Sequence, residues 1–206
     1  MTFLLLALIG YLIGSIPSSY LSMRLFTGRD IRALGRGEAT VTAVGKYAGK
    51  APATVAAVAE FSKALICLLI AGQMVGELWA SLVILTAAVY GSSWSIWLKG
   101  AGGQGQSMMS IGLLVLSPLA MAITAAFYLV PMAITRRHFL SNQLFHLAIP
   151  VVFSLWNGSW EWTVAGCLFF LPSSSMFGAR VTDARPWSRT ALVPTALELH
   201  RCFTNR

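Results

Sequence analysis

The sequence predicts an all-α integral membrane protein that forms one domain of seven membrane segments, and three observations support this. Hydrophobic residues make up 56% of the chain and charged residues only 11%, about half the charged fraction of a typical soluble domain. The apolar residues fall in long uncharged runs, and a helix needs ~20 such residues to cross a bilayer. The basic residues gather between alternate runs, as they do on the cytoplasmic side of membrane proteins.

The first three apolar runs are each long enough for one membrane segment: Thr2–Met23, Ala51–Gln73 and Leu78–Leu98. We expect the first to be a retained helix rather than a cleaved signal peptide, because no basic residue precedes Arg24. Six basic residues between positions 24 and 50 place that loop on the cytoplasmic side and the N-terminus outside.

The next run, residues 107–134, is too long for one segment and contains Ser117–Pro118 near its middle. Proline lacks an amide hydrogen and clashes with the preceding turn of a helix. We therefore expect two short segments, 107–117 and 118–134, which form a hairpin. The hairpin returns the basic residues that follow to the inner side.

The last two segments are Phe139–Asn157 and Trp160–Ala179, and they leave the C-terminus inside. The whole chain, 1–206, is then a single membrane domain with a basic C-terminal tail at 180–206. With this topology, 14 of the 15 basic residues lie on one side of the membrane, and the exception is Lys63. Such an asymmetry is typical of a multi-pass membrane protein with the N-terminus out and the C-terminus in.

The formal net charge of +8 would suggest a nucleic-acid partner in a soluble protein. Here the concentration of basic residues on one membrane face explains the charge, and no basic surface with interleaved aromatic residues is evident. We expect no nucleic-acid partner. The three cysteines and three histidines have no metal-ligand spacing, so we expect neither a disulfide framework nor a metal site.

Two glycine-rich basic loops, both predicted to lie inside, are the candidate ligand sites. The first spans residues 28–46, and the second is "KGAGGQGQ" at residues 99–106. Backbone amides in such loops form concavities that bind anions, and arginine binds phosphate through two parallel hydrogen bonds. The alternatives are a basic loop that only fixes topology and touches lipid headgroups, and a flexible turn. The second loop lacks the Gly-Lys-Ser/Thr ending of a Walker motif.

The pair Glu60 and Lys63 lies within an apolar segment at a spacing that places both on one helix face. Ionisable residues inside a membrane are functional candidates by default. We favour the alternative that they form a structural ion pair that orients this helix.

Taken together, these stretches resemble the bacterial acyl-phosphate:glycerol-3-phosphate acyltransferases. The family pattern GSIPxGYLxxRLxxGxDIRxxGSGNxGATNxxRxxG is matched at Gly14, Ser15, Ile16, Pro17, Tyr20, Leu21, Arg24, Leu25, Gly28, Asp30, Ile31, Arg32, Gly35, Gly37, Thr42 and Gly49. The family's DxxKG is similar to "EFSKA" at 60–64, and its GHxFPVFLxFKGGKG is similar to "GSSWSIWLKGAGGQG" at 91–105.

The resemblance implies a multi-pass enzyme of the bacterial plasma membrane that acts in phospholipid biosynthesis. It would transfer an acyl group from acyl phosphate to glycerol 3-phosphate, giving lysophosphatidate, without cofactor or metal. We expect the substrate-binding residues to be Arg32, Gly35, Arg36, Gly37, Thr42, Lys46, Lys99, Gly102, Gly103 and Gly105. No catalytic side chain is assigned.

The chain departs from the family pattern at several candidate phosphate ligands. Arg36 replaces a serine, Glu38 and Ala43 replace asparagines, and Lys46 replaces an arginine. Further departures are Ser92 for a histidine and Ala101 and Gln104 for lysines. These changes favour an alternative hypothesis, an inactive family member that binds lipid or a partner. Transport of an anionic solute ranks last, because the sequence has no internal repeat.

Overall fold

The computed structural model describes residues 1–35, 37–136 and 138–173, and within these ranges the chain is helical without strands. The elements are α1 (Thr2–Ser15), α2 (Ser18–Thr27), η1 (Ile31–Ala33), α3 (Val41–Ala48), α4 (Lys50–Met74), α5 (Leu78–Ser93), α6 (Gln106–Leu116), α7 (Pro118–Thr135), α8 (His138–Asn157) and α9 (Glu161–Ser173). The predicted all-α class is confirmed.

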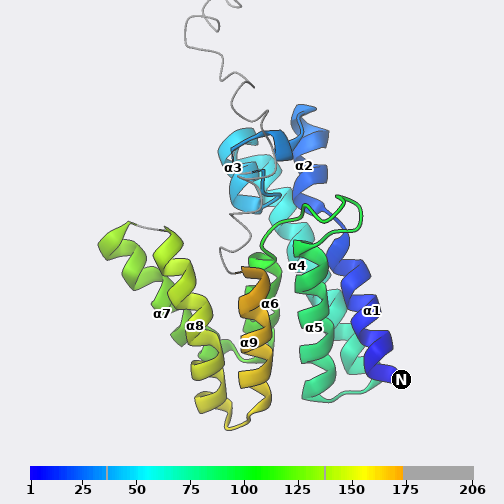
Figure 1. Cartoon of the computed structure of the whole chain (residues 1–206), viewed down its shortest axis with the longest axis vertical. Coiled ribbons are helices and arrows are strands. Elements are labelled where there is room, and N and C mark those ends of the chain that lie inside the picture. The colour runs from blue at the N-terminus through cyan, green and yellow to red at the C-terminus, as the bar shows by residue number, and fades with distance from the viewer. Residues whose placement is uncertain (36, 137, 174–206) are drawn as a thin grey trace, which may run out of the picture.

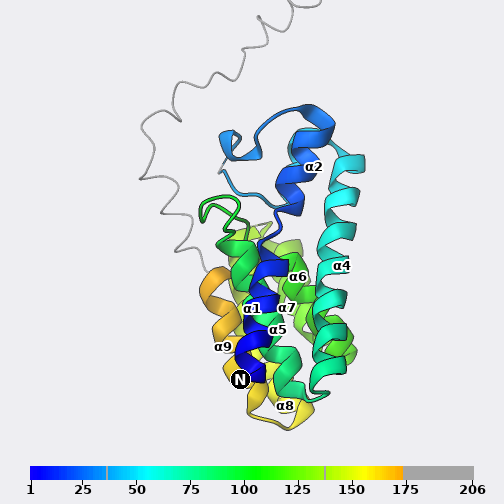
Figure 2. The ribbon, with the colours of Figure 1, turned by 90° about the vertical axis from the view of Figure 1, so that its right-hand side faces the viewer.

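The long helices run side by side, and the glycine-rich loops gather at one end of them (Figure 1). α2 and α3 lie beyond the ends of α1 and α5, at the end opposite the N-terminus, and α4 extends far enough to reach both (Figure 2). α7 and α8 form a pair at one edge. This arrangement places the two candidate loops at the same end of the molecule.

Three clusters of buried side chains hold the helices together. One joins α5, α6, α7, α8 and α9 through residues such as Leu85, Leu113, Phe153 and Phe169. A second joins α1, α4, α5 and α6, and a smaller third cluster around Met23 packs α2 and η1 against α3 and α4. The third cluster fixes the first candidate loop to the end of α4.

α1 and α5 pack closely because glycines face the neighbouring backbone. A Cβ added at Gly10 or Gly14 would meet the carbonyl oxygen of Ile84 or Ala88, and one at Gly91 would meet that of Tyr11. Small residues allow such close contact between membrane helices. The close contact fixes the end of α5, from which the second candidate loop starts.

The predicted segment Thr2–Met23 is wrong as a single helix, because the chain breaks between α1 and α2. Ile16 has an extended backbone, as is usual for a residue before proline, and Pro17 caps the second helix. The break leaves carbonyl groups near position 16 without helical partners. The ammonium group of Lys63 donates a hydrogen bond of 2.9 Å to the Ile16 carbonyl oxygen.

The predicted segment Leu78–Leu98 is too long, because α5 ends at Ser93. The carbonyl oxygens of Ser92 and Ser93 accept hydrogen bonds from the amides of Gly103 and Gly102. Continuing the helix would require these same carbonyls for the amides four residues further on. The glycine loop therefore ends the helix by folding back onto it.

The predicted break at Ser117–Pro118 is confirmed, since α6 ends at Leu116 and α7 begins at Pro118. In Figure 1 the two helices run in opposite directions, as expected for a hairpin. Of the segment predicted at Trp160–Ala179, α9 is described, and the residues after Ser173, including the basic tail, lie outside the described part of the chain.

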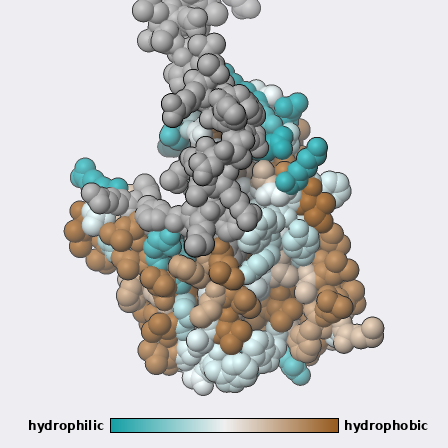
Figure 3. Space-filling model, in the orientation of Figure 1, coloured by the Kyte–Doolittle hydropathy of each residue, from teal (hydrophilic) through white to brown (hydrophobic). Residues whose placement is uncertain are grey.

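Within the described ranges, the chain has three helical stretches that are long and apolar enough to cross a membrane: Thr2–Thr27, Lys50–Met74 and Pro118–Thr135. α5, α6 and α9 are apolar but shorter. Large hydrophobic side chains such as Leu4, Leu69 and Leu155 point outward. In the view of Figure 3, hydrophobic side chains dominate the lower part of the molecule, and hydrophilic ones gather towards the end that carries α2 and α3. Seven segments and their orientation stay predictions.

Candidate functional site

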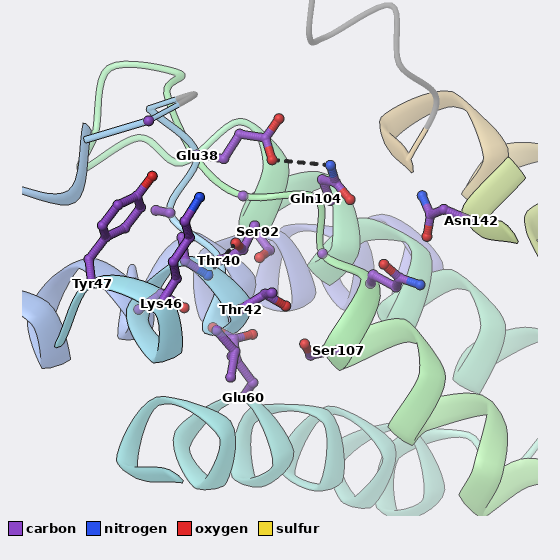
Figure 4. Close-up of a pocket in the computed structure, with 18 of the residues that line it drawn as sticks. Glu38, Thr40, Thr42, Lys46, Tyr47, Glu60, Ser92, Gln104, Ser107 and Asn142 are labelled. Atoms are coloured by element: carbon purple, nitrogen blue, oxygen red, sulfur yellow. Dashed lines mark hydrogen bonds between the residues drawn. The ribbon is translucent and has the colours of Figure 1, made fainter. Parts of the chain in front are cut away.

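A cavity of about 560 Å³ opens where the two glycine-rich loops meet (Figure 4). Its walls come from Leu34 and Gly35, from residues 38–43, from α3, from Glu60 of α4, from Ser92 near the end of α5, and from residues 103–107. Tyr128 of α7 and Asn142 of α8 complete it on the side of the helical pair. The cavity thus draws on segments spread over most of the described chain.

The two loops touch each other directly at this cavity. A Cβ added at Gly103 would lie 2.5 Å from the carbonyl oxygen of Ala39, so only glycine allows the backbones to come this close. Beside this contact, the Gln104 side-chain amide donates a hydrogen bond of 3.2 Å to the Glu38 carboxylate. The sequence-based expectation that both loops contribute to one site agrees with this geometry.

The N-terminus of α6 opens onto the cavity without a side-chain cap. Gly105 precedes the helix in the left-handed conformation, with φ +64°, and no side chain in the described part of the chain caps the first amides. Gln106 and Ser107, the first two residues of the helix, both line the cavity. Uncapped amides at a helix N-terminus carry partial positive charge and bind anions such as phosphate.

A second helix N-terminus, that of α3, lines the same cavity. The Thr40 hydroxyl caps this helix by accepting a hydrogen bond of 3.2 Å from the Ala43 amide. Thr42 and Lys46 are one turn apart and both line the cavity, where Figure 4 shows them on the same side. Among the described residues that line the cavity, Lys46 is the only basic one.

A buried ion pair forms the wall of the cavity at α4. Glu60 and Lys63 are 7% and 6% exposed, and the Lys63 ammonium lies 2.8 Å from the Glu60 carboxylate. The predicted pairing is therefore present. Glu60 and Gly102 also line a small adjoining cavity of about 10 Å³, close to the size needed for one water molecule.

Arg32 is a predicted ligand that the structure places away from this cavity. Its guanidinium forms a bidentate pair with Asp30, with a shortest distance of 2.7 Å, and lies over the Tyr20 ring. The hydrogen bond from Arg32 lowers the pKa of Asp30, and the same bond raises the pKa of Arg32. Both groups thus stay charged near neutral pH, and Arg32 orders its own loop.

The other predicted ligands divide into three groups. Gly35, Thr42, Lys46, Gly103 and Gly105 line the main cavity. Gly102 lines the small adjoining cavity. Gly37 and the exposed Lys99 are not among the described residues that line either one, and Arg36 lies outside the described residues. The roles of all ten residues in substrate binding stay predictions.

Several polar residues of the cavity were not among the predicted ligands: Ser19, Glu38, Thr40, Glu60, Ser92, Gln104, Gln106, Ser107, Tyr128 and Asn142. Ser107 directly follows the second glycine loop. Predicting that a helix begins there would have made Ser107 a candidate, because helix N-termini bind anions. Tyr128 comes from a helix that carries no local motif. Asn142 ends the stretch "RRHFLSN", which loosely resembles a basic loop of the family. Within the described ranges, His, Cys, Asp and Glu form no group of three or more that could hold a metal.

Comparison with known proteins identifies the same family that the sequence motifs resemble. The sequence profile of the glycerol-3-phosphate acyltransferases matches residues 4–179. A glycerol-3-phosphate acyltransferase of Thermosynechococcus vestitus is 34% identical over 167 residues, which cover 76% of this chain and 79% of that protein. One from Desulforudis audaxviator is 31% identical over 164 residues, 79% of this chain and 82% of that protein.

Solved structures with a similar fold include PlsY (YgiH), an integral membrane glycerol 3-phosphate acyltransferase. Its glycerol 3-phosphate form superposes with a TM-score of 0.73 at 22% identity, covering 88% of this chain and 93% of that one. The lysophosphatidic acid form gives a TM-score of 0.70 at 21% identity and the same coverage. At this identity the likeness establishes the fold, and the arrangement of helices is that of an integral membrane protein.

Proposed function

The chain belongs to the glycerol-3-phosphate acyltransferase family, and we propose that its cavity joins glycerol 3-phosphate to the acyl group of an acyl phosphate. The product is lysophosphatidate, an early intermediate of phospholipid biosynthesis. The observation that carries this proposal is the convergence of the two loops with the uncapped N-terminus of α6 on one cavity. The structure of the relative PlsY in a glycerol 3-phosphate form supports the acceptor.

The phosphate of glycerol 3-phosphate is expected to bind between the first amides of α6 and the Lys46 ammonium. These amides are uncapped, and Lys46 is the basic side chain that the described cavity wall provides. Backbone amides at a helix N-terminus and a lysine ammonium both donate hydrogen bonds to a bound phosphate. The hydroxyl groups of Thr42 in α3 and Ser107 in α6 line the same cavity and suit the glycerol hydroxyls (Figure 4).

The reaction requires the protein to position its two substrates, and it needs no nucleophilic side chain because the hydroxyl group of glycerol 3-phosphate attacks the acyl phosphate directly. The terminal hydroxyl oxygen of glycerol 3-phosphate forms an ester bond to the carbonyl carbon of the acyl phosphate. The bond between that carbon and the phosphate oxygen breaks, and the hydroxyl proton leaves with inorganic phosphate. Holding both reactants in one cavity removes much of the entropic barrier, and backbone amides stabilise the charge on the departing phosphate.

The acyl chain of the donor is expected to reach the cavity from the membrane. Tyr128 of α7 lines one side of the cavity. The residues on either side of it in the sequence, Phe127 and Leu129, are exposed on the apolar surface. We further propose that the cavity faces the cytoplasmic side of a bacterial plasma membrane. The concentration of basic residues in the loops at that end supports this orientation.

The test uses purified protein in detergent with palmitoyl phosphate and glycerol 3-phosphate. The proposal predicts release of phosphate and formation of lysophosphatidate in equal amounts, both dependent on the acceptor. Hydrolysis of the acyl phosphate without lysophosphatidate would contradict it. Binding of both ligands without turnover would instead support the hypothesis of an inactive, ligand-binding family member.

A further inference from the structure

We propose that Glu38 determines acceptor specificity by charge, weakening the binding of dianionic glycerol 3-phosphate relative to acceptors that carry less negative charge. This inference rests on the proposed function, because it concerns the acceptor in the same cavity. It starts from the contact between Glu38 and Gln104, which lies at the junction of the two loops.

The negative charge of Glu38 has no basic partner in the described structure. One oxygen of its carboxylate, Oε2, accepts the hydrogen bond from the Gln104 side chain, and that amide is neutral. The described residues place no lysine, arginine or histidine nitrogen within 4.0 Å of this carboxylate. The hydrogen bond therefore fixes the position of the carboxylate without neutralising it.

Glu38 stands close to the expected position of the phosphate. Its partner Gln104 is two residues before Gln106, the first residue of α6, and all three line the cavity. Among the described residues on the cavity wall, Lys46 contributes one positive charge and Glu38 one negative charge. Glu60 is balanced by Lys63. The side chains of the described wall thus have no net charge, which leaves the partial positive charge at the α6 N-terminus to attract the phosphate.

Charge and tethering are two separable effects of Glu38. A glutamine at position 38 still accepts a hydrogen bond from Gln104 but carries no charge. A lysine at position 104 still donates to Glu38 and neutralises it. Glu38→Gln and Gln104→Lys therefore each keep a possible link between the loops while raising the charge of the wall by one. If the charge matters, both variants bind glycerol 3-phosphate more tightly.

The experiment measures binding by calorimetry for the parent, Glu38→Gln, Gln104→Lys and the control Glu77→Gln. Glu77 is exposed and directly precedes α5, at the opposite end of the bundle from the cavity. The two ligands are glycerol 3-phosphate and its methyl phosphodiester, which has the same skeleton and one negative charge fewer. Glu38→Gln decides the question, with Glu38→Asn in its place if that variant fails to fold; Gln104→Lys supports the result but does not decide it alone, because a lysine at position 104 can also bind the phosphate directly.

We expect each cavity variant to bind glycerol 3-phosphate roughly tenfold more tightly than the parent, because charge interactions near a protein surface persist over several ångströms. The gain for the methyl phosphodiester should be about half as large on a logarithmic scale. Unchanged binding, an equal gain for both ligands, or the same gain in Glu77→Gln would overturn the proposal.

An assay of acyl transfer by the parent protein shows whether a failed test concerns the role of Glu38 or the proposed function on which that role rests. If the parent binds glycerol 3-phosphate but forms no lysophosphatidate, the proposed reaction fails and the binding data still decide the role of Glu38. If the parent forms lysophosphatidate and the variants bind no more tightly, only the role of Glu38 is wrong. Absence of binding in the parent and in both variants overturns both.

Discussion

The ammonium group of Lys63 in α4 donates a hydrogen bond of 2.9 Å to the carbonyl oxygen of Ile16, at the break between α1 and α2. The same ammonium lies 2.8 Å from the Glu60 carboxylate on the cavity wall. Lys63 thus satisfies a backbone group freed by the helix break and also balances a buried charge beside the site. A single side chain links the fold of the first segment to the cavity.

Replacing Lys63 with methionine should destabilise the protein by ~3–5 kcal/mol, because Glu60 would remain buried without a partner. The double variant Glu60→Gln/Lys63→Met should lose less, since no unpaired charge remains. Unfolding in mixed micelles with increasing dodecyl sulfate measures both. Lys50→Met, at the exposed start of the same helix, is the control. Equal stability of Lys63→Met and the control would show that the ion pair has no structural role.

Gly103→Ala should reduce acyl transfer by roughly 10²-fold, because a displacement of about 1 Å in a site can have this effect. The added Cβ would lie 2.5 Å from the Ala39 carbonyl oxygen, a backbone atom, and would push the two loops apart. Gly72→Ala is the control, since no heavy atom lies within 4 Å of a Cβ at that position in α4. An active Gly103→Ala enzyme would contradict the close contact of the loops.

Lys46→Ala should weaken the binding of glycerol 3-phosphate by about 10- to 100-fold, since a hydrogen bond to a charged group contributes ~1.5–3 kcal/mol. The expected reason is loss of the one basic side chain on the described cavity wall. Calorimetry measures the change, and Lys50→Ala, which does not line the cavity, is the matched control. The same affinity in Lys46→Ala and the parent would place the phosphate elsewhere.

The loop around Asp30 should lose its order in acid. Its hydrogen bond with Arg32 lowers the pKa of Asp30, so the folded loop favours the ionised carboxylate. This contribution is complete above the ordinary value of about 4 and is lost as the pH falls through the lowered pKa. Hydrogen exchange of residues 28–35, corrected for intrinsic rates, should rise in that range. Asp30→Asn should show fast exchange throughout; a parent without pH dependence would disprove this role.

The membrane class could be predicted because its signals are local, and the meeting of the two loops because the basic residues place both loops on the same side of the membrane. Apolar runs, Ser117–Pro118 and the Glu60–Lys63 spacing each predict a feature that the structure contains. Pro17 is also a usable local signal, since the residue before proline favours an extended backbone, and it indicates the break that a continuous segment Thr2–Met23 ignores.

Other features depend on contacts between distant residues and have no local signal. α5 ends at Ser93 because amides from the loop at 102–103 take its last carbonyls. Tyr128 and Asn142 reach the cavity only through the packing of α7 and α8. Arg32 matched a family motif, but its guanidinium pairs with Asp30, which a pattern of residue types does not reveal.

The central claim, that the two loops form one site for the acceptor phosphate, is tested most directly by an experimental structure with glycerol 3-phosphate bound. We predict density for the phosphate within hydrogen-bond distance of the first amides of α6 and of the Lys46 ammonium. A ligand bound to Arg32 or Lys99 instead, outside the cavity beside Gly103, would contradict the account.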